Sequence, residues 1–190
     1  LRTDLVDAVA PAMDAAIRGG FSIVEFTLTC PDVLQHIAAF SERADIIVGA
    51  GTVLTPEDAR QAVEAGARFL VSPVVDEAVI DEAAALGVAI MPGTYTPTEM
   101  LRAHRAGAGL QKLFPAPEAG PKHVKSILGP MPFLRIVPTN GVHVNNAAAY
   151  LKAGAWAVGF VQALFDPNDI AAGRFDQIEE RAQKLRTALR

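Results

Sequence analysis

The sequence is poor in the residues that build disulfides, metal sites and aromatic clusters. Its 190 residues include one cysteine, Cys30, and only 6% of them are aromatic. A single cysteine excludes an internal disulfide and a cysteine-rich metal site. The histidines are far apart and form no ligand pair at helical or strand spacing: His36, His104, His123 and His143. We therefore expect metal-free chemistry in a reducing, cytosol-like compartment.

The sequence also has no strong net charge and no long hydrophobic run. A formal net charge of −4 gives no basic surface for nucleic acid. No apolar run reaches the roughly 18 residues needed to cross a bilayer, so no membrane partner is expected. No signal peptide is visible, and we expect a cytoplasmic location, or a plastid if a leader has been removed. The length and the 51% hydrophobic content predict one domain, residues 1–190, with a sizeable core.

The chain repeats one pattern: a short apolar strand, a tight turn, a helix and a glycine. The expected strands end 20 to 24 residues apart, near Thr27, Gly49, Ser72, Pro92, Phe114, Pro138 and Val161. This spacing is typical of βα units. Leu1-Arg2 resembles the end of an eighth strand that is largely absent from the given chain. The pattern predicts an α/β fold, a (β/α)₈ TIM barrel, with a doubly wound open sheet as the alternative.

Hydrophobic periodicity and turn residues give the expected element boundaries. Strands are predicted at 21–28, 46–48, 69–71, 88–91, 110–115, 133–137 and 156–161. Helices are predicted at 5–18, 31–41, 55–66, 76–86, 96–107, 121–128, 145–153 and 175–189. No linker or low-complexity stretch interrupts the series.

One lysine, Lys112, lies inside a predicted strand, in the run Leu110-Gln111-Lys112-Leu113-Phe114-Pro115. The other lysines lie in segments that are predicted to be amphipathic helices, where their ammonium groups are easily solvated. Burial of an amine lowers its pKa toward the range in which it is a nucleophile. The alternative is a lysine at a strand end whose ammonium group extends to water.

A carboxylate is expected on the same inner surface as this lysine. Glu25 shares one face of its strand with Ile23 and Thr27, because successive side chains alternate between faces. If this face and the Lys112 face both point into the barrel, Glu25 and Lys112 form a general base and a nucleophile. A structural ion pair between them needs the same geometry, and it would hold the amine protonated and inert.

Polar turns follow other predicted strands at the same end of the barrel. Gly51-Thr52 offers backbone N–H groups and a hydroxyl, and Pro138-Thr139-Asn140-Gly141 does the same after the seventh strand. Gly159-Phe160-Val161-Gln162-Ala163 occupies the eighth position. Loops after strands seven and eight of such barrels often bind phosphate. Glycines in these places are also ordinary turn residues, and that interpretation stays open.

Six segments occur in a characteristic order: Glu25-Phe26-Thr27-Leu28, Val48-Gly49-Ala50-Gly51-Thr52-Val53-Leu54, Ser72-Pro73, Met91-Pro92-Gly93, Lys112-Leu113-Phe114-Pro115-Ala116 and Pro138-Thr139-Asn140-Gly141. Together they resemble the 2-keto-3-deoxy-6-phosphogluconate (KDPG) / 4-hydroxy-2-oxoglutarate (KHG) aldolase family, class I aldolases on a trimeric (β/α)₈ barrel. The resemblance covers essentially the whole chain except the first strand.

The resemblance implies roles for particular residues. Lys112 matches the lysine that forms a Schiff base with the C2 ketone of the substrate, and Glu25 matches the glutamate that moves protons through a water. The implied substrate-binding residues are Gly51, Thr52, Pro73, Pro92, Phe114, Thr139, Asn140, Gly141 and Gln162. Because the iminium is itself the electron sink, no metal and no separate cofactor are implied.

The implied reaction is cleavage of KDPG to pyruvate and glyceraldehyde 3-phosphate by a homotrimer of the Entner-Doudoroff pathway. Three alternatives stay open. The first is an aldolase for an unphosphorylated 2-keto-4-hydroxy acid such as KHG. The second is a catalytically weak barrel that serves as a binding protein. The third is another phosphate-binding barrel enzyme, such as an epimerase or a synthase.

Three positions depart from the family pattern. Thr29 stands where the family often has an arginine that binds the substrate carboxylate. Asn140-Gly141 replaces the usual Gly-Gly, and Gln162-Ala163 replaces the usual Gly-Ser. Arg2, at the end of the first strand, is a candidate for the missing guanidinium.

Overall fold

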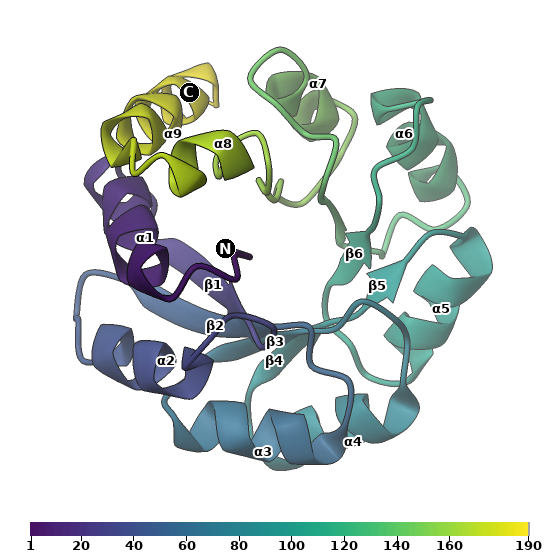
Figure 1. Ribbon diagram of the computed structural model, residues 1–190. Helices are drawn as coiled ribbons and strands as arrows, with labels where there is room; N and C mark the ends of the chain where they lie inside the picture. Colours follow the sequence, from purple (N-terminus) through teal and green to yellow (C-terminus); the bar gives the residue numbers. More distant parts are fainter. Residues whose placement is uncertain (190) are drawn as a thin grey trace.

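The structure is a ring of parallel strands surrounded by helices, seen in a computed structural model that describes residues 1–189 (Figure 1). The first sheet contains, in spatial order, β1 (Ile23–Thr27), β2 (Ile47–Gly51), β3 (Phe69–Val71) and β4 (Ala89–Met91). The second contains β5 (Gly93–Thr94), β6 (Gln111–Leu113) and β7 (Ile136–Pro138). All neighbouring strands are parallel, and Pro92 alone separates β4 from β5.

Single residues extend this array at both ends. The N-terminal amine of Leu1 donates to the carbonyl of Glu25, and the Leu1 carbonyl accepts from the Thr27 N–H at 3.1 Å. This is the bonding pattern of a parallel neighbour of β1. At the other end, Thr139 forms a parallel bridge with Gly159. The strand positions and their order confirm the predicted (β/α)₈ barrel and exclude the open doubly wound sheet.

Helices form the outer layer of the barrel (Figure 1). After the 3₁₀ turn η1 (Val6–Ala8) come α1 (Val9–Arg18), α2 (Val33–Ser41), α3 (Pro56–Glu64), α4 (Glu77–Ala85), α5 (Pro97–Arg105), α6 (Pro121–Leu128), α7 (Ala147–Lys152), α8 (Pro167–Ala171) and α9 (Phe175–Ala188). The last helix packs on the first, α9 against α1. Within residues 1–189, no helix combines the length and the apolar character that a membrane span requires.

Local sequence fixes the starts of two of these helices. Thr55 and Thr96 each form a capping box with the acidic residue three positions later, Asp58 and Glu99 respectively. A proline follows each threonine, where its missing N–H costs nothing. Both starts agree with the sequence prediction.

The predictions were wrong in the last third of the chain. The expected strand at 156–161 is reduced to the single bridge at Gly159. Trp156 is 60% exposed, and the Arg135 guanidinium lies 4.7 Å from the centroid of the Trp156 ring. The apolar side chain of Trp156 therefore does not mark a buried strand. The strand expected at 133–137 begins only at Ile136.

Helix α8 was not predicted. Its signal is the pair Asp166-Pro167, in which the aspartate caps the helix by accepting from the Asn168 N–H and the proline occupies the first turn. At five residues, α8 is too short for hydrophobic periodicity to reveal it.

Core packing decides which strand face points inward. Phe26 of β1 packs against Phe40 of α2, with 5.1 Å between ring centroids. Leu113 of β6 is fully buried in a cluster with Met100 of α5. Because side chains alternate along a strand, Glu25 and Lys112 lie on the opposite face, toward the barrel interior.

Close backbone contact at Gly93 joins β5 to the loop after β3. A Cβ atom at Gly93 would lie 2.1 Å from the Pro73 carbonyl oxygen and 2.4 Å from its carbon. We expect Gly93→Ala to lower the free energy of unfolding by roughly 1–3 kcal/mol, because backbone must move to make room. Urea denaturation measures this. Gly129→Ala, where the nearest atom is 3.5 Å away, is the matched control, and an equal loss in both variants would contradict the prediction.

Candidate active site

Lys112 is held on the inner face of β6 by hydrogen bonds to the neighbouring strand β5 and the proline before it. Its N–H donates to the Pro92 carbonyl at 2.9 Å, and its carbonyl accepts from the Thr94 hydroxyl at 2.9 Å. The half-buried side chain directs its Nζ over the ring of Phe114, 4.6 Å from the centroid. The backbone of Lys112 is therefore fixed, and its amine lies beside an aromatic wall.

The electrostatics around Lys112 favour the neutral amine. Burial of the side chain lowers the pKa of Lys112 below its ordinary value. The Glu25 carboxylate opposes this and raises the pKa, while the Arg2 guanidinium lowers it further. The net result is a lowered pKa, so a larger fraction of Lys112 is unprotonated at a given pH than for an exposed lysine.

Glu25 occupies space that a glycine leaves open on the neighbouring strand. A Cβ atom at Gly51 would lie 1.7 Å from the Glu25 Oε1 atom. Gly51 is buried, and its missing side chain is what allows the carboxylate to lie there. Among residues 1–189, no ion pair joins Glu25 to Lys112 or to any other side chain. The tight structural ion pair considered from the sequence is therefore not present in this part of the chain.

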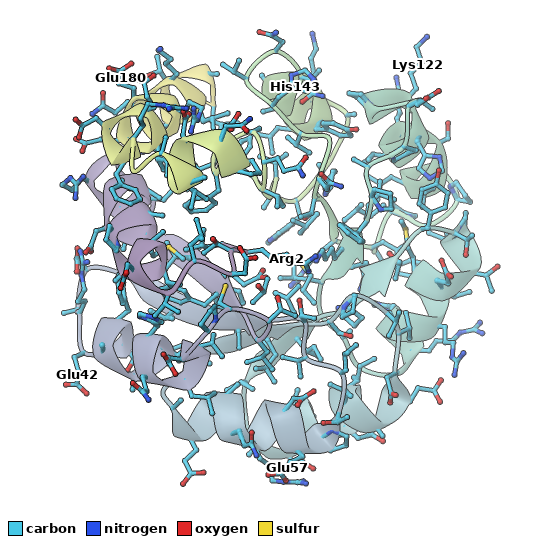
Figure 2. The ribbon with its side chains drawn as sticks, viewed as in Figure 1. Arg2, Glu42, Glu57, Lys122, His143 and Glu180 are labelled. Atoms are coloured by element: carbon cyan, nitrogen blue, oxygen red, sulfur yellow. The ribbon has the colours of Figure 1, made fainter. Side chains whose placement is uncertain are left out.

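Arg2 reaches toward the turn after β2. Its Nη2 donates to the Thr52 hydroxyl at 3.2 Å, and Figure 2 shows Arg2 near the centre of the ring. Thr52 has φ 63°, a left-handed conformation that costs a non-glycine residue about 1–3 kcal/mol. Such strain is concentrated at functional sites, and here it presents the hydroxyl to the Arg2 guanidinium.

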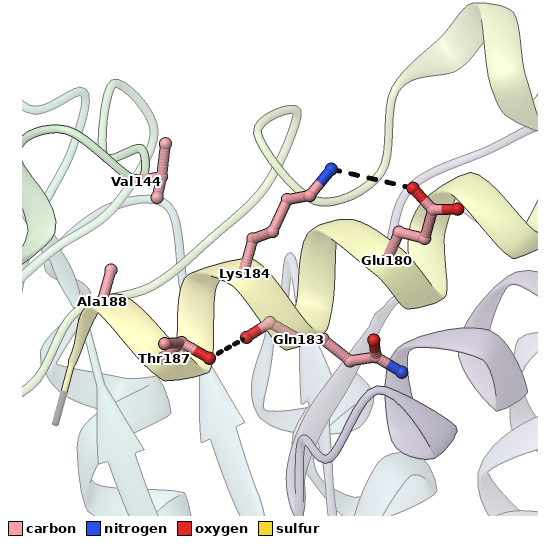
Figure 3. A pocket seen from close by; sticks show the side chains of 6 residues that line it. All are labelled: Val144, Glu180, Gln183, Lys184, Thr187 and Ala188. Atoms are coloured by element: carbon pink, nitrogen blue, oxygen red, sulfur yellow. Dashed lines mark hydrogen bonds and ion pairs between the residues drawn. The ribbon is translucent and has the colours of Figure 1, made fainter.

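An open cleft of about 620 Å³ lies beside Arg2. Residues near the N-terminus form one side of it, together with Thr29, and α8 forms the other: Arg2, Thr3, Asp4, Leu5, Thr29, Pro167, Ile170 and Ala171. Arg2 and Thr29 thus share one cleft, although they are far apart in sequence. A second open pocket of about 550 Å³ lies between α9 and the loop at Val144, and none of the predicted site residues lines it (Figure 3).

The turn after β7 carries three more of the predicted binding residues, Thr139, Asn140 and Gly141. Thr139 is buried, and its N–H donates to the Leu113 carbonyl at 3.0 Å. Asn140 and Gly141 both have positive φ, 61° and 89°. The Asn140 carbonyl accepts from the Ala116 N–H at 2.9 Å, which folds this turn over the segment that follows β6.

The structure brings some predicted residues together and leaves others at the rim. Glu25, Gly51, Thr52, Lys112 and Phe114 lie on adjacent parts of the inner surface. Pro73 and Pro92 contribute through their backbone, which packs on Gly93 and bonds Lys112. Gln162 is exposed in the turn that follows Gly159, at the rim.

Sequence analysis missed Thr94. It is buried, and its hydroxyl donates to the backbone of Lys112. A signal for it exists in the sequence, since a polar residue in the strand beside the lysine needs a partner when buried. Over the described residues, 1–189, no three histidine, cysteine, aspartate or glutamate side chains are grouped as metal ligands.

Comparison with known proteins decides the family. The family model for KDPG and KHG aldolases matches residues 1–181. The chain belongs to this family. This aldolase is 38% identical over 188 residues to the 2-dehydro-3-deoxy-phosphogluconate aldolase of Treponema pallidum (strain Nichols), and the match covers 94% of the chain and 86% of that relative.

Solved structures resemble this aldolase closely. A KDPG aldolase from Legionella pneumophila, with pyruvate captured at low pH as a covalent carbinolamine intermediate, superimposes with a TM-score of 0.87. It is 26% identical, and the match covers 96% of this chain and 90% of that one. A cube-shaped cage designed by fusing symmetric oligomeric domains gives a TM-score of 0.88 at 28% identity, covering 97% and 68% of the two chains.

These findings confirm three predictions: the family, the barrel fold and the enzyme class. The protein is an aldolase, a carbon–carbon lyase. The roles of individual site residues stay predictions, which the geometry makes testable.

The space that Gly51 leaves for Glu25 generates the first of these tests. In Gly51→Ala the new methyl group would displace the carboxylate, and we expect kcat to fall by roughly 10²–10⁴-fold, the usual contribution of a general acid–base group. Steady-state kinetics and a thermal melt would be measured together. Gly109→Ala is the matched control, because no atom lies within 4 Å of a Cβ added there. Full activity in Gly51→Ala would contradict the prediction.

Proposed function

We propose that this aldolase cleaves KDPG to pyruvate and glyceraldehyde 3-phosphate through a Schiff base on Lys112. The observation that carries the proposal is the partly desolvated amine of Lys112 on the inner face of β6, with its pKa lowered by burial. The family supports it, since a solved relative holds pyruvate as a covalent carbinolamine. The name of the Treponema pallidum relative supports the phosphorylated substrate over KHG.

The proposed steps follow from the amine and the carboxylate. Neutral Lys112 attacks the C2 ketone to form a carbinolamine, which loses water to give an iminium. Glu25, acting through a water, removes the proton from the C4 hydroxyl. The C3–C4 bond then breaks, its electron pair forms the C2=C3 bond of an enamine while the C=N π electrons return to nitrogen, and the aldehyde leaves. Protonation at C3 and hydrolysis release pyruvate and restore Lys112, so no external cofactor takes part.

The remaining residues are proposed to hold the two ends of the substrate. Thr52 and Thr139 hold the pyruvyl carboxylate, Pro73 and Pro92 line the pocket, and Phe114 is its aromatic wall. Arg2 supplies the guanidinium that Thr29 does not. It fits this role because it reaches Thr52 and lies close enough to Lys112 to lower its pKa.

The phosphate end is assigned to the turns that carry Asn140, Gly141 and Gln162. Side-chain amides there donate hydrogen bonds where most of the family uses backbone N–H groups or a serine. The left-handed backbone at Asn140 and Gly141 supports this, because successive N–H groups in such a turn converge on an anion.

We further propose a homotrimer in the cytoplasm. Similarity to a cage assembled from symmetric oligomeric domains supports an oligomer. The compared relatives come from bacteria, so a plastid location has no support.

Covalent trapping tests the central claim. When the enzyme is incubated with pyruvate and sodium borohydride, we expect the adduct on the peptide that contains Lys112, because reduction converts the iminium to a stable secondary amine. Peptide mass spectrometry would locate it. Lys112→Ala should form no adduct and lose cleavage activity.

Lys125→Ala is the matched control, because this lysine lies on the outer helix α6. An adduct on Lys125, or undiminished cleavage by Lys112→Ala, would contradict the Schiff-base claim. The substrate claim is separate, and a kcat/KM for KHG equal to that for KDPG would contradict it.

Arg2 makes a prediction about pH. Arg2→Gln removes a positive charge that lowers the Lys112 pKa, so that pKa should rise and less neutral amine should be present at any given pH. The acidic limb of the pH profile of kcat/KM, on which activity rises as Lys112 loses its proton, should therefore shift to higher pH. The enzyme should also exchange the methyl protons of pyruvate with solvent, and the KM for pyruvate in this exchange should rise roughly tenfold to a hundredfold, because a charged hydrogen bond is lost.

Arg2→Lys separates charge from shape. It keeps the positive charge, so the pH profile should stay near that of the wild type, but it loses the two-pronged geometry that suits a carboxylate. A pH profile that does not move in Arg2→Gln would rule out the proposed influence of Arg2 on Lys112.

A further inference from the structure

Arg181 of α9 joins two other segments through one guanidinium. Its Nε donates to the Leu164 carbonyl at 3.0 Å, and its Nη1 donates to the carboxylate of Asp169 in α8. The two side chains are largely buried, 26% exposed for Arg181 and 13% for Asp169. The third nitrogen, Nη2, is buried without a hydrogen-bond partner in the part of the chain that the structure describes. These two contacts therefore hold the guanidinium.

The first segment is the turn that carries Gln162. It follows Gly159, whose bridge to β7 ties this part of the chain to the barrel. The Val161 carbonyl accepts from the N–H groups of Leu164 and Phe165, at 3.1 and 2.8 Å. Leu164 is buried, and Arg181 bonds its carbonyl directly. The position of the turn at Gln162 thus depends on Arg181.

The second segment is α8, one wall of the cleft beside Arg2. Asp169 accepts from Arg181 and from the Nε of Arg174, at 2.7 Å for the latter. The hydrogen bond from Arg181 contributes most, and that from Arg174 next, to lowering the pKa of Asp169. Asp169 and Arg181 are therefore both charged at neutral pH. The same helix contributes three residues to the cleft, Pro167, Ile170 and Ala171.

We propose that Arg181 and Asp169 are positioning residues that determine how the aldolase holds the part of its substrate beyond the pyruvyl group. Because the pair holds both the Gln162 turn and α8, it determines the positions of these two segments at the end of the site away from Lys112. This inference rests on the proposed function, in which Gln162 meets the phosphate end. No hydrogen bond or ion pair joins either residue to Lys112, Glu25 or Arg2 among the described residues, so we expect chemistry on pyruvate alone to depend much less on the pair.

Two reactions of the same enzyme distinguish an effect on binding of the distal end of the substrate from an effect on the reacting end. We expect Arg181→Gln and Asp169→Asn each to raise the KM for KDPG about tenfold, through the lost charged hydrogen bond and the displaced turn. Exchange of the pyruvate methyl protons in deuterated water, followed by NMR, should stay within about twofold of wild type. If the pair had a purely structural role, KDPG cleavage and pyruvate proton exchange would both become slower by a similar factor.

The chain offers a matched control in another ion pair that involves α9. Arg18→Gln breaks the more exposed ion pair between Arg18 of α1 and Glu179 of α9, at 2.8 Å, and should change neither reaction. If Arg181 and Asp169 act as one unit, the double variant should raise the KM no more than either single variant.

Hydrogen exchange gives a readout that needs no substrate. Backbone amides over residues 160–172 should exchange faster in Arg181→Gln than in wild type or Arg18→Gln, as measured by mass spectrometry. Arg181→Lys, which can bond only one of the two segments at a time, should fall between. If Arg181→Gln does not fold, Asp169→Asn and Arg181→Lys decide the question.

An unchanged KM for KDPG, equal losses in both reactions, or unchanged exchange over residues 160–172 would overturn the inference. A wild-type enzyme that neither cleaves KDPG nor exchanges pyruvate protons would instead overturn the proposed function. The hydrogen exchange of the backbone amides would then still decide whether the pair holds these two segments.

Discussion

Burial of one amine on the inner surface of the barrel is the constraint on which the proposed site depends. Moving an ammonium group out of water is costly, and the energy falls when the group loses its proton. In this structure no tight ion pair keeps the ammonium group charged. Glu25 lies near Lys112 but forms no ion pair with it within residues 1–189, and burial lowers the pKa of Lys112. An amine in such a place is both less protonated and free to react.

The surroundings of Lys112 are arranged by backbone more than by side chains. Gly51 makes room for the carboxylate, Gly93 allows the loop at Pro73 to approach, and Pro92 bonds the lysine through its carbonyl. Short strands suit this arrangement, since β5, β6 and β7 each have only two or three residues. The turn after β7 begins close to the lysine, because the Thr139 N–H donates to the carbonyl of the adjacent Leu113.

Helix α9 holds two neighbouring segments, the Gln162 turn and α8, through one side chain. The turn with Gln162 and the short helix α8 have little hydrophobic periodicity of their own, and Arg181 ties both to the long helix α9. The departures from the family pattern, Thr29, Asn140 and Gln162, all lie on this side or in the turn after β7. Lys112 and Glu25 thus lie within strands, whereas these three residues lie in segments that follow strands.

The sequence alone determined the βα repeat, which residues share a strand face with Glu25 and with Lys112, and the identity of these two residues as candidates; core packing decided that both faces point inward. The features that the sequence determined follow from local patterns, because alternation, capping and turn residues act over a few positions. Only the tertiary structure decided that Arg2 reaches Thr52, that Glu25 fills the space above Gly51, and that Arg181 joins α8 to the Gln162 turn. Each joins residues far apart in the chain, and no local pattern encodes a contact that depends on how the whole barrel closes.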